Sequence, residues 1–169
     1  MITNTELEQK GNQFPSYIKK YSKDVDTLYF TAKNGVHKGA QECVKALNAL
    51  YKKEKALHQK QFSAEGFEWI NHGDHENSVI SYIRKGNDEK DNLIIILNLT
   101  PIPRENYRIG VPKAGTLKEV FSSDAKEFNG TGDFSNKKVT TDKIEWNFKP
   151  YSAEFNLPPL GMMVFKYSG

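Results

Sequence analysis

Histidine and cysteine are the residues of this chain that most readily bind a metal or act as nucleophiles, and they are few: four histidines and one cysteine in 169 residues. His72 and His75 enclose Gly73 and Asp74 in one short segment. A zinc site needs three or four ligands at suitable spacing, often including cysteine, and this segment lacks a third and fourth. We interpret the segment as a polar turn, and predict no metal site and no cofactor.

Catalytic groups are the next chemistry to consider. Cys43 falls on the apolar side of a predicted helix, which favours a small buried side chain over a reactive thiol. The acidic residues are scattered, and none forms the paired carboxylates that a glycosidase uses as acid and nucleophile. The glycine-rich nucleotide loops and the G-x-S-x-G and H-E-x-x-H motifs are missing from the sequence. We therefore predict no catalytic residue in this chain.

Aromatic side chains offer a different chemistry, because an exposed tryptophan or tyrosine can stack on the face of a sugar ring. Trp146 stands among polar residues near a proline turn and is a candidate for such a contact, as are Tyr107 and Tyr151. Ordinary packing of these rings is the alternative. Trp69 alternates with Phe67 along a predicted strand, which favours burial of its indole ring in the core.

The elements that would position these residues fall into three zones. Residues 1–35 are polar and poor in aliphatic side chains, so we expect a weakly structured segment or short helices. Residues 36–61 predict one long amphipathic helix, because apolar residues recur three and four positions apart. Its apolar face must be covered by the following domain, by another domain or by a second copy. That face consists of Ala40, Cys43, Val44, Leu47 and Leu50.

The third zone, residues 62–169, has an all-β pattern. Residues 79–84 alternate apolar and polar side chains, as half-buried strands do, whereas residues 93–99 are mostly apolar, as in a central strand covered on both faces. We predict about eight antiparallel strands that form a sandwich, so the fold class is mainly β. The expected strands are residues 67–70, 79–84, 93–99, 107–111, 117–121, 139–144, 153–157 and 162–167.

A proline-rich stretch, NLTPIPRENYRIGVP, follows the apolar strand. Pro101 and Pro103 cannot donate hydrogen bonds to a strand partner, so the strand must end before them. Arg104 and Arg108 lie near Glu105 in the sequence that follows. We interpret the stretch as a rigid connection with a local ion pair. Docking of the two arginines onto another domain is the alternative.

Charge and hydropathy limit the partners. The net charge is +3, and the lysines of the first zones are spread around a helix, which favours a solvated face over a nucleic-acid surface. The longest apolar run, residues 93–97, is too short to span a membrane, and no signal-peptide pattern opens the sequence. A lone cysteine fits a reducing compartment. These features predict a cytoplasmic protein that binds neither nucleic acid nor membrane.

Several segments, in order, carry a family resemblance: HKGAQECVKALNALYKKEKALH, FSAEGFEWI, ENSVISYIRKG, NLTPIPRENYRIGVP, LKEVFSSDAKEFNGTG and LPPLGMMVF. Together they resemble the C-terminal all-β domain of bacterial 1,4-α-glucan (glycogen) branching enzymes, in the α-amylase superfamily. The resemblance implies a β-sandwich of the α-amylase C-terminal type, preceded by the last helix of a catalytic barrel. In that family, the barrel cleaves an α-1,4-glucan and rejoins it through an α-1,6 bond. None of the family's catalytic motifs is present, and Asn147-Phe148-Lys149 replaces the usual His-Gly-Arg.

The resemblance therefore predicts a non-catalytic C-terminal module, inactive alone, that supports the barrel of a branching enzyme in glycogen biosynthesis. It would meet the barrel through the apolar helix face and through Arg104 and Arg108. One alternative is a free-standing α-glucan-binding module that uses Trp146, Tyr151 and Tyr107. Another is a homodimer or interaction protein that associates through the helix face.

Overall fold

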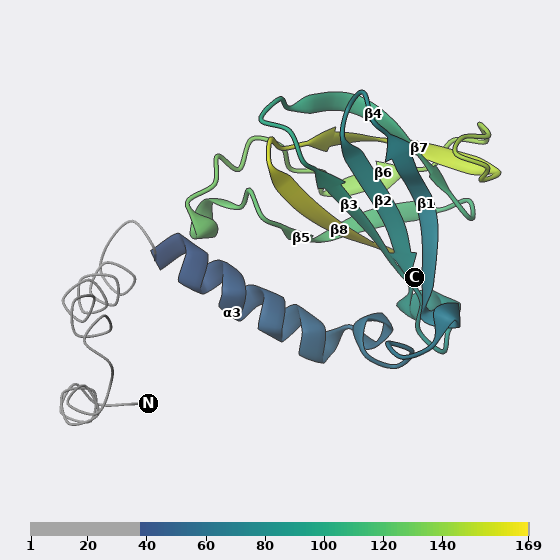
Figure 1. Ribbon diagram of the computed structural model, residues 1–169, viewed down its shortest axis with the longest axis horizontal. Coiled ribbons are helices and arrows are strands. Elements are labelled where there is room, and N and C mark those ends of the chain that lie inside the picture. The colour runs from purple at the N-terminus through teal and green to yellow at the C-terminus, as the bar shows by residue number, and fades with distance from the viewer. Residues whose placement is uncertain (1–37, 169) are drawn as a thin grey trace, which may run out of the picture.

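The computed structural model describes residues 38–168, so our expectations for residues 1–35 and for the first two residues of the predicted helix lie outside the described residues. The described chain begins with the helix α3 (Lys38–Lys53) and continues into eight strands (Figure 1). The strands are β1 (Phe67–Asp74), β2 (Val79–Arg84), β3 (Leu93–Asn98), β4 (Arg104–Val111), β5 (Thr116–Ser122), β6 (Lys138–Thr140), β7 (Tyr151–Leu157) and β8 (Gly161–Tyr167).

The strands form two sheets. The larger has six strands in the order β1-β2-β3-β8-β5-β6, and the smaller pairs β4 with β7. Every pairing between these strands is antiparallel. In Figure 1, α3 lies on one side of the six-stranded sheet and the β4–β7 pair lies on the other. The prediction of a mainly-β fold, with about eight antiparallel strands after one helix, is confirmed.

The continuously apolar strand β3 is covered on both faces, as predicted. Ile94 and Ile96 point into the cluster between the two sheets. Leu93 and Ile95 point the other way, into a second cluster beneath α3. Because successive side chains of a strand alternate between faces, a strand buried on both sides must be apolar at nearly every position.

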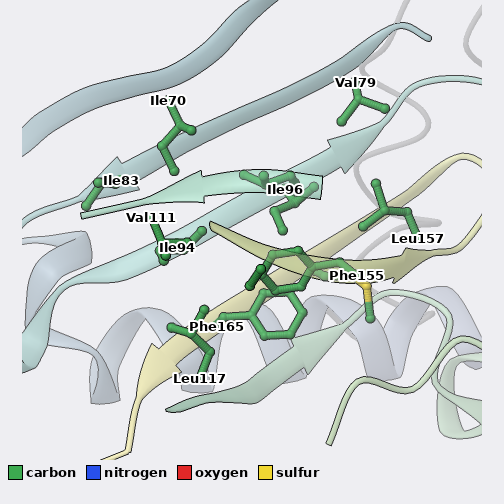
Figure 2. Packing of buried hydrophobic residues seen from close by; sticks show 13 residues of the cluster. Ile70, Val79, Ile83, Ile94, Ile96, Val111, Leu117, Phe155, Leu157 and Phe165 are labelled. Carbon is green, nitrogen blue, oxygen red and sulfur yellow. The ribbon is translucent and has the colours of Figure 1, made fainter. Parts of the chain in front are cut away.

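The cluster between the sheets is the main core of the domain. Phe155 of β7 and Phe165 of β8 meet there with ring centroids 4.7 Å apart, and Figure 2 shows them side by side. Leu117 of β5 and Leu157 of β7 are almost fully buried in the same cluster. The smaller sheet therefore closes the inner face of the larger one without help from the helix.

The helix is shorter than predicted. We expected it to continue to residue 61, but α3 ends at Lys53 and two short 3-10 turns follow, Lys55–Leu57 and Ala64–Gly66. Glu54 leaves the helix with an extended backbone, φ −93° and ψ 105°. Its side chain is only 3% exposed and accepts a hydrogen bond from Lys166 of β8 at 2.8 Å. A tertiary contact of this kind overrides the helical pattern of the sequence.

Two other expectations are corrected. Gly73 and Asp74, predicted as a turn, belong to the end of β1, and the turn follows them, with the amide of Ser78 bonded to the carbonyl of Asp74 at 2.9 Å. Residues 139–144 were expected to form one strand, yet β6 stops at Thr140. Beyond it, Asp142 makes an isolated bridge to Ser152 of β7, so this segment passes from one sheet to the other.

Candidate functional site

The apolar face predicted for the helix is divided between two surfaces. Leu50 is buried against the six-stranded sheet, and Cys43 and Leu47 pack at the margin of the same cluster. Val44 stays 57% exposed, and Ala40 is exposed as well. At 100° of rotation per residue, Ala40, Val44 and Tyr51 share one flank of α3. We call these three residues the outward stripe; the chain's own sheet covers the rest of the predicted face.

Close packing and a group of charges fix α3 to the sandwich. A Cβ atom at Gly39 would clash with the carbonyl oxygen of Phe128, so this helical turn needs a glycine. At the other end, Lys166 donates to Glu54 and lies 3.4 Å from Asp91. Partial burial lowers the pKa of the Lys166 ammonium, but the hydrogen bonds and charges of Glu54 and Asp91 outweigh burial, and the pKa is raised.

Trp69 is not in the core, which corrects the prediction made from its alternation with Phe67. Its indole is 47% exposed. The strand register places Trp69 opposite Tyr82, Tyr82 opposite Ile95, and Ile95 opposite Val164, in one row across the sheet face that α3 covers. The helix lies over Ile95 and Val164 but leaves the β1 end of the row open. Trp69 instead packs edge-on against Phe67, with ring centroids 4.7 Å apart.

Two of the three predicted sugar-contacting rings face the core. Tyr107 and Tyr151 are half-buried and pack against the cluster between the sheets. The Tyr107 hydroxyl donates a short hydrogen bond to Asp74. Burial and the Asp74 carboxylate both raise the pKa of Tyr107. Its ring and hydroxyl are therefore already engaged within the domain.

Trp146 belongs to a tight hairpin that the sequence did not reveal. Its backbone amide and carbonyl pair with those of Lys149 at 3.0 and 2.9 Å. The two residues between them, Asn147 and Phe148, have positive φ angles of 49° and 58°. Trp146 is 47% exposed, and Phe148 at the tip is 98% exposed. Phe148 was not predicted as a site residue. It stands where members of the resembled family carry glycine, and that difference was a usable signal.

The two arginines do not join the helix face in one surface. Both belong to β4, in the sheet on the far side of the sandwich from α3 (Figure 1). Arg108 pairs with Asp142 at 3.0 Å and with Glu154 at 2.6 Å. Arg104 donates to the backbone carbonyl of Asn77. Among the described residues, neither arginine forms the predicted ion pair with Glu105, because strand pairing brings other acceptors closer.

A hollow of about 290 Å³ opens beside Glu68, at one end of the sandwich. Lys60, Lys85 and Lys113 line it together with Glu89. Hydrogen bonds from Lys149 and Lys85 hold the pKa of the Glu68 carboxyl below its usual range, so Glu68 is ionised at neutral pH. A general acid needs the opposite shift. Two of these lysines are paired with glutamates of the lining, Lys85 with Glu68 and Lys113 with Glu89.

The histidine segment serves a structural purpose. Asp74 accepts hydrogen bonds from the amide and the side chain of Asn77 as well as from Tyr107. Within residues 38–168, no three His, Cys, Asp or Glu side chains gather closely enough to hold a metal ion. In the same part of the chain, no helix has the length and hydropathy needed to cross a membrane.

Known proteins are similar to this chain over most of its length. The 1,4-alpha-glucan branching enzyme GlgB of Aquifex aeolicus is 41% identical over 93% of this chain but only 24% of its own length. The GlgB enzyme of Halothermothrix orenii is 39% identical over 92% of this chain and 25% of its own length. The GlgB enzyme of Nitrosococcus oceani is 43% identical over 78% of this chain and 17% of its own length. The chain thus spans a quarter or less of these relatives.

A family model decides the assignment. Residues 69–168 match the model described as the alpha amylase C-terminal all-beta domain. This region contains every strand except the start of β1 and forms both sheets of the sandwich. The resemblance to branching enzymes drawn from the sequence is confirmed, and the chain belongs to the family of alpha-amylase C-terminal all-β domains.

Proposed function

We propose that this chain is the non-catalytic C-terminal module of a 1,4-α-glucan branching enzyme. The observation that carries the proposal is the pattern of similarity, which covers nearly the whole chain but only about a quarter of the branching enzymes it matches. The matched family is a C-terminal domain, so the remaining three-quarters of such an enzyme would precede this module. That part would transfer α-1,4-glucan segments to form α-1,6 branches, and this chain would support it.

The outward stripe of α3 is the surface we propose for contact with the catalytic part. Val44 is more than half exposed, and Tyr51 nearly so. α3 is also the first described element, so polypeptide arriving from a preceding catalytic part reaches the sandwich through this helix. Burying apolar side chains against a partner removes them from water at roughly 25 cal/mol per Å². Arg104 and Arg108 are left out of this surface, because they lie across the sandwich and pair within it.

The first experiment asks whether the chain has the chemistry by itself. The purified protein is incubated with amylose, and new α-1,6 bonds are counted after debranching. The expected result is none, because the proposal assigns every catalytic group to the part that this chain does not span. Measurable branching by the isolated chain would overturn the proposal.

The second experiment tests the supporting role. The matching quarter of the Aquifex aeolicus branching enzyme is replaced by this chain, and the chimera is compared with variants Val44→Asp and Ala49→Asp. Ala49 is also exposed on α3 but lies about 140° around the helix from Val44. We expect an active chimera that Val44→Asp destabilises by about 1–2 kcal/mol. Ala49→Asp should cost only the helix propensity of aspartate, about 0.7 kcal/mol, and the same amount in the chimera and in the isolated chain.

The isolated chain provides the matching control. There Val44 is exposed, so Val44→Asp should change the free energy of unfolding by less than about 0.5 kcal/mol. A loss of equal size in the chimera and in the isolated chain would mean that the stripe has no partner. Sedimentation velocity then addresses the alternative of a homodimer: a dimer that Val44→Asp dissociates would assign the stripe to a second copy instead.

A further inference from the structure

The hairpin of residues 146–149 holds an aromatic ring in a backbone conformation that suits glycine. Its two central residues, with φ of 49° and 58°, form a turn of the I′ kind, for which Asn-Gly is the favoured pair. Asn147 tolerates the left-handed region, but Phe148 crowds its Cβ against the following carbonyl. A glycine would close the same hairpin with less strain. The phenylalanine is therefore best explained by its ring and not by the turn.

The tip is also held firmly in place. The side-chain carbonyl of Asn147 accepts a hydrogen bond from the amide of Gly110 on β4 at 3.0 Å. A Cβ atom at Gly110 would clash with the carbonyl oxygen of Trp146, so the hairpin lies directly on β4. Lys149 pairs with Glu68 of β1. In Figure 1, the yellow-green segment before β7 projects from the sandwich. The backbone that carries the ring therefore loses little entropy when a ligand binds.

The surroundings of the ring distinguish between two kinds of ligand. Phe148 is 98% exposed and Trp146 is 47% exposed. Lys143 and Glu145 are exposed too, and among residues 38–168 neither takes part in an ion pair. Ile144 stands between these two charges. Unpaired charged residues thus adjoin the exposed rings along the chain, and charged residues are depleted at the centre of a protein interface.

A sugar chain suits this combination of exposed rings and unpaired charged groups. One face of a pyranose ring presents C–H bonds, which pack on the electron-rich face of an aromatic ring. Its edge presents hydroxyl groups, which can bond to free ammonium and carboxylate groups such as those of Lys143 and Glu145. We propose that this hairpin is a contact site for α-glucan chains, with Phe148 as the main stacking ring and Trp146 as its neighbour. The choice of an α-glucan rests on the proposed function.

Affinity electrophoresis of the full chain in native gels, with and without glycogen, tests this inference. We compare the parent with Phe148→Gly and with Phe62→Ala. Phe62 is the control because it is also almost fully exposed, at 97%, and is distant in sequence from the hairpin. The parent and Phe62→Ala should be retarded by glycogen. Phe148→Gly should lose at least two-thirds of the retardation, while its melting temperature rises by about 2 °C because the strain is relieved.

Each contrary outcome overturns the inference. Parent protein that glycogen does not retard, or Phe148→Gly that migrates like the parent, would show that the ring does not bind glucan. Equal losses in Phe148→Gly and Phe62→Ala would mean unspecific adhesion of exposed rings. If Phe148→Gly left retardation intact but destabilised the chimera, the tip would be a protein contact.

The result can be separated from that of the proposed function. If the chimera is active but glycogen does not retard the isolated chain, only the proposed glucan site is wrong. If glycogen retards the chain but the chimera is inactive, the glucan site stands and the proposed supporting role is wrong.

Discussion

Two neighbouring residues of β1 differ in burial, and the difference shows how the two faces of the large sheet are covered. Ile70 is buried on the inner face, while Trp69 is 47% exposed on the outer face. The inner face is closed as far as β1 because the β4–β7 sheet reaches it. The cluster beneath α3 on the outer face draws residues from β2, β3, β5 and β8 and none from β1. The inner face is therefore complete, and the outer face has room for a partner.

The largest expected effect compares an inner ring with an outer one. Phe155 is fully buried between the sheets, so Phe155→Ala should cost about 3–5 kcal/mol of unfolding free energy through lost burial and an unfilled cavity. Trp69→Ala should cost only about 1 kcal/mol, because the ring keeps half its surface in water and leaves no enclosed void. Urea denaturation measures both. Comparable losses would mean that the outer face is as tightly packed as the inner one.

A smaller effect should separate the helix from the sandwich. Glu54→Gln removes the buried charge that Lys166 faces at 2.8 Å, and should lower the free energy of unfolding by about 2 kcal/mol. The loss is limited because Lys166 is partly exposed and keeps its ion pair with Asp91. Hydrogen exchange should speed up in the α3 amides more than in β8. Glu42→Gln, which removes only an exposed pair with Lys45, should cost less than about 0.5 kcal/mol. If hydrogen exchange speeds up equally in α3 and throughout the sheet, then Glu54 does not act mainly by holding α3 on the outer face.

The smallest effect concerns pH and the end of the sandwich where Glu68 joins β1 to the hairpin through Lys149. The pKa of Glu68 is lowered from 4.5 by this hydrogen bond and by that of Lys85. Because the folded-state pKa lies below the unfolded one, the stabilisation is complete above about pH 4.5 and is lost as the pH falls through the folded value.

Urea midpoints measured across this window provide the check. Glu68→Gln should be less stable than the parent at neutral pH, and the gap should close in acid. Glu105→Gln, at an exposed site, should run parallel to the parent. A gap that persists unchanged to pH 3 would show that the Glu68 charge does not stabilise the fold.

Much of the fold could be predicted because local patterns of apolar and polar residues specify its strands. Alternation located β2 at its observed bounds, and the continuous apolar run of β3 predicted burial on both faces. The candidate site was harder to predict. Tyr107 and Tyr151 were selected by residue type, yet strand pairing turns both toward the core. Phe148 was overlooked because its exposure depends on a hairpin register that no local pattern specified.

The sequence by itself determined that this is an antiparallel β-domain with a preceding amphipathic helix, because the side-chain period of each element follows from its own backbone geometry. Only the tertiary structure decided which of those side chains are covered. Trp69 and Ile95 lie in one row of one sheet face, and the position of α3 leaves the first exposed and buries the second. Glu54 likewise lies outside the helix, where it pairs with Lys166, 112 residues away. Such contacts join distant parts of the chain, so packing and not local sequence selects them.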